Sequence, residues 1–433
     1  MRFVSSGMQY RQRTGMFIAL IFLLSCLTAR SQTPPPAAPA LTPSQTNPCQ
    51  TQPGEGKGIK DFFKCGKHLY DKVTNRDGVR LVVGSVAPGG GLAGGVGYGH
   101  RTTGPTWQTE FTSAARVSFR KYWEIDSNLR VTKTSDSTTA SPDIGNLKSN
   151  IYGFLKDMPR LDFFGVGPET QQAGRVLFHY REAVAGADIS QPINRWFDLG
   201  GAVEGIWPDL ISISNPTITS VERKYTEATA PGLNSQPPHL HLVAFAGLHS
   251  RGQPESRRLE YLFLYHIYQD VGDHLYSFRR FNADLRHKFP FGDKNEFRLR
   301  GRLSLAETRD GQRVPFYLME TLGGSNIRGD DSLRGFRDYR FRDRDYFLVQ
   351  TEFLRELYGP VDLIGFYDVG KVAGSVSRFD EGRLRHTYGA GIVVVPRRLD
   401  NILFKFYVGL GSGEGVRGYF GGGLGGRSQR LTR

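Results

Sequence analysis

Three arginines at alternate positions, Arg298, Arg300 and Arg302, bring charge together within the 433-residue sequence. Alternate residues of a β-strand share one face, so these three guanidinium groups would line that face together. Guanidinium groups bind carboxylates and phosphates, and three of them facing lipid would be very costly. We therefore expect a lumenal basic face that is filled with water or paired with carboxylates.

Two acidic residues further along the chain should lie on the same polar face of the sheet as these arginines. Glu352 lies on the polar face of YFLVQTEFLREL, and Asp368 lies opposite Tyr367 and Val369 in the next apolar stretch. On adjacent strands both carboxylates would point inward. Left alone they would repel and one would take up a proton, so we expect a cation between them.

Motifs for enzyme chemistry are not recognisable in the sequence. We find no Ser-His-Asp elbow, no HExxH motif and no paired-carboxylate spacing, and the ten histidines are scattered. The glycine-rich run GGGLAGGVG lacks the helix and the acidic residue of a dinucleotide site. We predict that the chain is not an enzyme and that it holds no cofactor and no metal.

Alternation of apolar and polar residues dominates from residue 79 to the end. In WQTEFTSAARVSFR one face carries Trp107 and Phe111 while the other carries Glu110 and Arg116, and ILFKFYVGL repeats the pattern. A soluble β-sandwich also alternates, but these apolar faces are rich in Phe, Tyr and Leu over the whole region. We predict an all-β fold, a transmembrane antiparallel β-barrel of about sixteen strands over residues 79–433.

Composition agrees with strands that cross a membrane. The chain has 53 glycines and 12% aromatic residues, and its mean hydropathy of −0.38 excludes a bundle of apolar helices. The formal net charge of +14 would suit a nucleic-acid binder, an anion-selective pore or a protein on anionic lipid. The N-terminus argues against nucleic acid.

The N-terminal residues have the features of an exported protein. Basic residues, the apolar run Met16 to Leu27 and small residues before residue 32 predict a signal peptide over 1–31. A proline-rich linker follows at 32–57, and then a short amphipathic helix or cap at 58–78 that could also plug the barrel or lie on the inner leaflet. In an oxidising compartment we expect a Cys49–Cys65 disulfide.

The segments GGSNIRGDDSLRGF, YFLVQTEFLREL and VDLIGFYDVGKVAG resemble the BamA, TamA and FhaC outer-membrane superfamily, also called the bacterial surface antigen barrels. Arg334, Gly335 and Phe336 match its RGF-type loop motif, and RLDFFGVGPET (160–170) resembles its FFGxG strand start. Glu352 matches its acidic strand position, and Asp368 and Gly370 match its aromatic-x-Asp-x-Gly strand. The likeness covers residues 79–425 and is strongest after residue 320.

The resemblance implies that Arg334 is the cation between Glu352 and Asp368. It would sit on a long loop that folds back into the barrel. Two roles stay open, a loop state needed for transport or insertion, and an internal brace. The family normally carries POTRA domains before its barrel, and we expect this chain to lack them.

Glycine is dense near both ends of the predicted barrel, in the stretches 82–99 and 416–426, which we interpret as its first and last strands. Glycine weakens strand pairing, so these two strands would meet at a weak closure. The resemblance implies a lateral gate there. Small residues packing beside a plug are the alternative.

We therefore expect an outer-membrane protein of a Gram-negative-type bacterium that takes part in the insertion or translocation of outer-membrane proteins. A passive, anion-preferring channel is the alternative, based on the lumenal arginines. Its partners would be outer-membrane lipids such as lipopolysaccharide, and client proteins or a periplasmic partner protein. We expect no nucleic-acid partner.

Overall fold

A computed structural model describes residues 77–133, 147–213, 219–250, 257–358, 361–394 and 404–422. The chain divides into two compact units, Met1–Cys65 and Gly66–Arg433, and the described residues all belong to the second. The predicted signal peptide, linker and Cys49–Cys65 disulfide, and the predicted helical segment up to residue 76, lie outside the described residues. In the described part no helix is long and apolar enough to cross a membrane.

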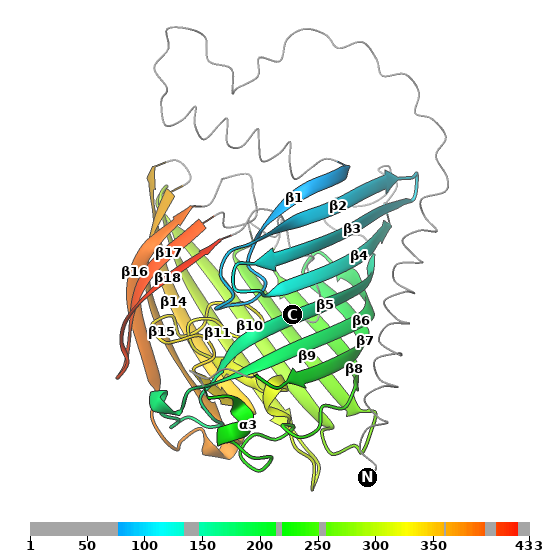
Figure 1. Ribbon diagram of the computed structural model, residues 1–433. Coiled ribbons are helices and arrows are strands. Elements are labelled where there is room, and N and C mark those ends of the chain that lie inside the picture. The colour runs from blue at the N-terminus through cyan, green and yellow to red at the C-terminus, as the bar shows by residue number, and fades with distance from the viewer. Residues whose placement is uncertain are drawn as a thin grey trace. The chain divides into compact units, whose positions relative to one another are not determined.

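Sixteen strands form one antiparallel sheet in which neighbours in sequence are neighbours in space. This confirms the predicted fold class and strand number. The sheet curls into a barrel wall (Figure 1). Its strands are β1 (Gly78–Gly84), β2 (Ala93–Thr103), β3 (Trp107–Ser118), β4 (Trp123–Lys133), β5 (Lys148–Phe163), β6 (Val176–Asn194), β7 (Phe197–Ile211), β8 (His239–His249), β9 (Leu259–Asp270), β10 (Phe278–Phe291), β11 (Asn295–Glu307), β14 (Asp345–Tyr358), β15 (Val361–Ala373), β16 (Arg385–Val394), β17 (Phe404–Gly411) and β18 (Gly415–Gly422).

Burial along the strands follows the alternation in the sequence. On β8 the inward His239 and His241 are buried, while Leu240 and Leu242, which alternate with them, are 41% and 40% exposed. Large apolar side chains are exposed in the same way on β9, β14 and β17. An apolar outer face and a polar inner face are what a strand needs when lipid lies on one side and a polar lumen on the other.

Connections between strands alternate between the two ends of the barrel. One end, here called the loop end, carries helix α3 (Val221–Lys224) and the long connection 308–344. The other end carries tight turns such as those at 195–196 and 292–294. Short turns at one end and longer loops at the other are typical of outer-membrane barrels, in which the longer loops face outward.

Residues 308–344, here called the internal loop, fold back inside the sheet. The loop contains the 3-10 turn Phe316–Leu318 and a two-stranded sheet of β12 (Glu320–Leu322) and β13 (Phe341–Asp343). Phe316 is buried against Phe163 and Phe178 of the wall, and Tyr317 stacks on Tyr180. The largest apolar cluster therefore lies between the loop and the wall.

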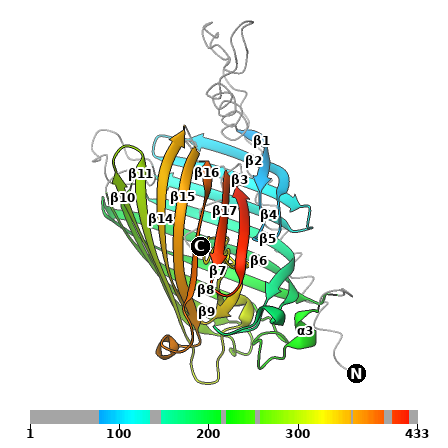
Figure 2. The same cartoon turned by 90° about the vertical axis from the view of Figure 1, so that its left-hand side faces the viewer.

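The two outer edges of the sheet are β1 and β18. Among the described residues β1 is hydrogen-bonded only to β2, and β18 only to β17. Figures 1 and 2 show blue β1 and red β18 at the two ends of the strand order. We call this junction the seam.

Two sequence interpretations near the seam were wrong. The stretch 82–99 is not one strand, because it contains the end of β1, a turn and the start of β2. Gly89 and Gly91 lie in the connection between the two strands and have φ of 77° and 76°, a left-handed backbone that glycine favours. Likewise 160–170 does not start a strand. It ends β5, and Gly165 and Gly167 leave the sheet with φ of 100° and 118°.

Candidate functional site

Arg334 projects from the internal loop to the inner faces of β14 and β15. Its Nε and Nη2 donate to the two oxygens of Asp368 at 3.0 and 2.5 Å, and its Nη1 donates to Glu352 Oε1 at 2.5 Å. The backbone N–H of Arg334 also donates to Asp368, at 3.2 Å. The structure thus brings together Glu352 and Asp368, which the alternation predicted to face inward, and Arg334, which the resemblance implied as the cation between them. We call them the lock cluster.

The carboxylate of Asp368 accepts further hydrogen bonds from neighbouring strands. Thr387 on β16 donates to its Oδ2 at 3.0 Å, and Gln350 on β14 donates to its Oδ1 at 3.3 Å. Gln350 also donates to the Ser332 carbonyl of the loop at 3.1 Å, so it joins wall and loop. The side chain of Asp368 is 0% exposed and that of Arg334 is 1% exposed, so each charge depends on the other for compensation.

Aromatic rings and carboxylates both favour the charged form of Arg334. The guanidinium carbon lies 3.9 Å from the centre of the Phe366 ring and 5.7 Å from that of Tyr407. Burial opposes the charge, but Asp368 and Glu352 outweigh it and raise the pKa of Arg334 above its ordinary value. Arg334 is therefore a charged joint between loop and wall.

Gly335 lets the loop backbone lie directly on β17. A Cβ on Gly335 would stand 2.4 Å from the backbone N of Gly411 and 2.5 Å from the carbonyl carbon of Leu410. Phe336 follows and is buried against Phe341 with ring centres 5.1 Å apart. Gly370 has a similar role on β15, because a Cβ there would lie 2.8 Å from the Phe347 carbonyl oxygen.

The three alternating arginines of β11 face inward and each has a carboxylate neighbour. Arg300 binds Asp284 of β10 through two contacts at 2.9 and 2.6 Å. Arg302 lies 3.2 Å from Asp330 of the internal loop, and Arg298 contacts Glu296 and lies 4.0 Å from Glu352. Burial opposes the negative charge of Asp330, but nearby guanidinium groups outweigh it and lower its pKa to about 2.

Further loop contacts reach both sides of the seam. Asp331 accepts from Lys405 on β17 at 2.6 Å and from the Tyr407 hydroxyl. Arg340 binds Glu414 in the β17–β18 turn and, at 2.9 Å, the hydroxyl of Thr170 between β5 and β6. The internal loop therefore links the β17–β18 edge to the early strands, although β1 and β18 do not pair.

Sequence reasoning missed these seam contacts. Tyr339 donates to the Pro88 carbonyl in the β1–β2 turn at 2.9 Å, across 251 positions of sequence. A loop has no hydrophobic period, so the direction of its side chains leaves no local signal. The clustered charges in 328–344 were the available sign that this segment binds polar partners.

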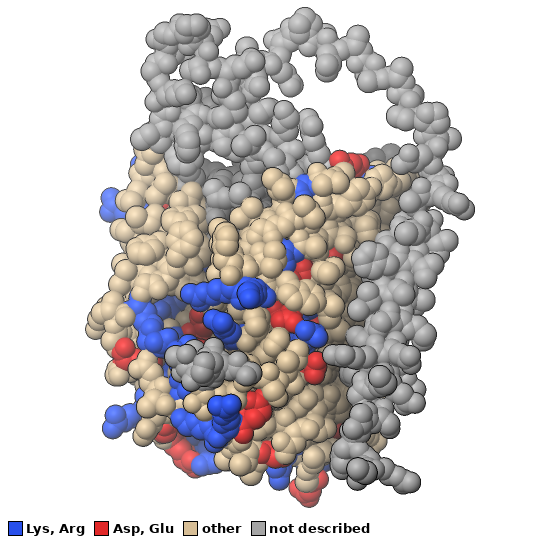
Figure 3. All heavy atoms as spheres, in the orientation of Figure 1, with Lys and Arg blue, Asp and Glu red and all other residues tan. Residues whose placement is uncertain are grey.

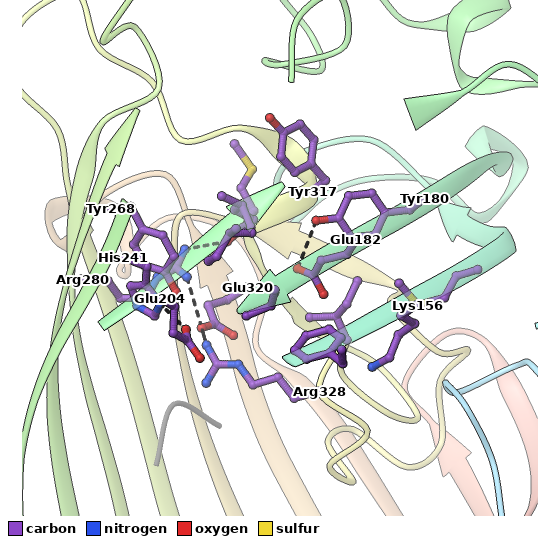
Figure 4. A pocket seen from close by; sticks show the side chains of 17 residues that line it. Lys156, Tyr180, Glu182, Glu204, His241, Tyr268, Arg280, Tyr317, Glu320 and Arg328 are labelled. Atoms are coloured by element: carbon purple, nitrogen blue, oxygen red, sulfur yellow. Dashed lines mark hydrogen bonds and ion pairs between the residues drawn. The ribbon is translucent and has the colours of Figure 1, made fainter. Parts of the chain in front are cut away.

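A second polar network lies in the lumen beside the internal loop. Glu204 accepts from Tyr152 at 2.5 Å and lies 2.7 Å from His241, which lies 3.0 Å from His266. Figure 4 shows His241, Glu204 and the Arg328–Glu320 pair around a cavity of about 170 Å³. Several of its polar groups pair with one another, and no set of three metal-ligating side chains occurs in the described part of the chain. We assign it no chemistry.

Comparison with known proteins addresses the fold. No family model matches the sequence, and no curated protein matches it. Among solved structures, BamA from Haemophilus ducreyi lacking POTRA domains 1–3 superposes with a TM-score of 0.53 at 13% identity, covering 81% of this chain and 70% of that one. The chain has the fold of the BamA-type outer-membrane barrels.

CdiB from Escherichia coli is also similar, with a TM-score of 0.50 and 12% identity over 80% of this chain. This chain covers 62% of the CdiB structure, so it spans less than two thirds of that protein. The predicted resemblance is confirmed as a shared fold. That fold is one of outer-membrane proteins, in agreement with the predicted location.

Proposed function

We propose that this chain acts in the outer membrane in the insertion or translocation of outer-membrane polypeptides. The observation that carries the proposal is the unpaired seam. Among the described residues β1 and β18 are each hydrogen-bonded to one neighbouring strand, so each is an edge strand of the sheet. An incoming strand can add to such an edge by main-chain hydrogen bonding.

The internal loop supports the same proposal. Arg334 fixes it to β14 and β15, and Arg340 joins the β17–β18 turn to the β5–β6 connection. A loop attached to both sides can hold the seam at a set opening while the wall stays intact. In this proposal the lock cluster stabilises the open-seam state and is more than a brace.

A passive, anion-preferring channel is less well supported. The β11 arginines that would select anions are each engaged by a carboxylate. The internal loop also fills part of the lumen with buried residues such as Phe316, Leu333 and Phe336. Those arginines are therefore part of the packing between loop and wall.

This proposal includes a periplasmic partner protein that brings client polypeptides to the seam. Copurification from native outer membranes tests this point: a periplasmic partner or chaperone recovered with the chain supports insertion, and recovery of the barrel alone argues for a channel.

Cross-linking of the seam tests the function directly. Leu81 on β1 and Phe420 on β18 are 67% and 66% exposed, so cysteines at these positions accept bifunctional reagents of graded length. The three native cysteines are first replaced by serine. We expect a cross-linked seam to stop insertion of a small outer-membrane barrel into vesicles, with recovery on cleavage of the reagent.

The matched control joins two strands that are already paired. Tyr388 on β16 and Leu410 on β17 are partners in register and are 58% and 36% exposed. A cross-link there should leave insertion unchanged. Unchanged insertion with the seam cross-linked would overturn the proposal.

A further inference from the structure

A cavity of about 340 Å³ opens at the seam, between β18, the internal loop, the β1–β2 and β3–β4 turns, and the loop-end parts of β5 and β6. Five arginines line it in addition to Arg334. Figure 3 shows lysine and arginine side chains gathered on this face, over the region where Figure 1 places the seam. The five are Arg120, Arg160, Arg175, Arg337 and Arg417.

The positive charge of this cavity is largely uncompensated. Arg175 pairs with Asp162 at 2.9 Å, and Arg120 donates to the Gly89 carbonyl at 2.6 Å, which carries no charge. Within the described residues Arg160, Arg337 and Arg417 form no ion pair through their side chains. Arginines placed this close repel one another unless an anion lies between them.

Two of these arginines also have buried nitrogen atoms without partners. The Nε atoms of Arg337 and Arg417 are shielded from solvent and have no hydrogen-bond partner among the residues that the structure describes. A buried donor without an acceptor is costly, so the geometry favours an acceptor supplied from outside the chain. The other lining acid, Asp338, already accepts from the Ser325 N–H at 2.9 Å, and burial raises its pKa to about 6.

We propose that this seam cavity binds a phosphate group, and that the phosphate belongs to the headgroup of a membrane glycolipid. Arginine matches phosphate through paired, charge-assisted hydrogen bonds. The cavity lies toward the loop end, since Arg417 follows the β17–β18 turn and Arg120 lies in the β3–β4 turn. Membrane-embedded barrels meet lipid headgroups at that level.

Apolar side chains around the cavity fit the acyl chains of such a lipid. Phe119, next to Arg120, is 91% exposed, and Val416, next to Arg417, is 63% exposed. A Cβ built on Gly418 would meet no atom within 4 Å, so the approach beside Arg417 is open. A free phosphate ion would use the arginines but not these apolar neighbours.

Binding of purified lipopolysaccharide to the full-length barrel in detergent micelles tests the inference, because it measures lipid binding and not client insertion. Arg337→Gln with Arg417→Gln should weaken binding by at least about tenfold, since one hydrogen bond to a charged group contributes that much. The matched control, Arg223→Gln with Arg309→Gln, removes the same charge from exposed sites and should bind as the unaltered protein does.

Three comparisons can overturn the inference. Equal binding of lipopolysaccharide from which the phosphates have been removed would show that acyl chains alone are recognised. Competition by inorganic phosphate as strong as that by the lipid would indicate a free-anion site. An equal loss of affinity in the control pair would indicate that the lipid responds to the net charge of the protein and not to this cavity.

A variant that should gain affinity guards against misfolding as the explanation. Asp338→Asn removes a carboxylate that lines the cavity, so we expect tighter lipid binding, by about threefold or more. On gels, the folded form of this variant should resist heating as well as that of the unaltered protein. Weaker or unchanged binding in Asp338→Asn would count against a phosphate in the cavity.

Discussion

Arg334 and Arg337 lie three positions apart on the same loop in opposite electrostatic surroundings. Arg334 is 1% exposed on its side chain and donates to both Asp368 and Glu352. Arg337 faces the seam cavity, and its buried Nε has no hydrogen-bond partner in the described part of the chain. Arginine thus fixes the loop to the wall at position 334, and in our proposal it binds a ligand at position 337.

The difference lies in the wall that each arginine meets. Behind Arg334 the strands β14, β15 and β16 are fully paired, and alternation brings Glu352, Asp368 and Thr387 inward together. Beside Arg337 the described sheet ends at β18, and the one strand carboxylate that lines the cavity, Asp162 of β5, pairs with Arg175 instead. The paired strands thus supply the carboxylates that neutralise Arg334. At the seam, in our proposal, the phosphate of a bound lipid neutralises Arg337.

The largest expected effect comes from breaking the lock cluster. Arg334→Ala removes the partner of a fully buried Asp368, and breaking a buried ion pair in this way costs about 3–5 kcal/mol. We expect the internal loop to leave β14 and β15. Loss of the heat-resistant gel form at lower temperature and higher conductance in planar bilayers would report this change.

A double-mutant cycle with Asp368→Ala gives the control. Because one residue removed leaves the other charge buried and unpaired, the double variant should be less destabilised than the sum of the two singles. Normal mobility and normal conductance in Arg334→Ala would show that the cluster matters little.

The second prediction concerns pH and Asp338. Burial and the nearby Asp162 and Asp331 outweigh the Ser325 N–H and raise the pKa of this carboxyl from 3.8 to about 6. The folded protein then holds this proton up to a higher pH than the unfolded chain does. Stability should therefore fall as pH rises from about 4 to about 6, by at most about 3 kcal/mol.

Asp338→Asn should remove this part of the pH profile and leave the protein more stable above pH 6, as measured by thermal loss of the folded gel form. The same pH series on Arg334→Ala should keep the slope, since Asp338 is still present there. A profile unaffected by Asp338→Asn would mean that another group titrates in that range.

Side chains on strands could be placed from the sequence, because alternation along a strand determines which face each side chain lies on. Glu352 and Asp368 could be placed inside because alternation along β14 and β15 determines which side chains face the lumen. The pairs of Asp331 with Lys405 and of Arg340 with Thr170 could not, because they join residues 74 and 170 positions apart through a loop without a period. The first strand was misplaced because its glycines also form the turn that ends it.

The third prediction tests the close approach of the loop to β17. Gly335→Ala places a methyl group where the backbone of Gly411 and Leu410 already lies, and overpacking of this kind costs about 1–3 kcal/mol. Gly301→Ala on β11 is the matched control, since a Cβ there meets no atom within 4 Å. Equal melting of the folded gel form in the two variants would show that the loop does not need this contact.

The smallest expected effect is at the contact between the loop and the β1–β2 turn. Tyr339→Phe removes the hydroxyl that donates to the Pro88 carbonyl, and a single hydrogen bond of this kind contributes about 0.5–1.5 kcal/mol. Global stability should hardly change. Amide hydrogen exchange in β1 should instead become faster, because this hydrogen bond is one of the attachments between the loop and the β1 side of the seam.

Tyr388→Phe on the outer face of β16, where the side chain is 58% exposed, should leave exchange in β1 as it is. Equal exchange in both variants would mean that Tyr339 does not hold the seam, and the bridging role would then rest on Arg340.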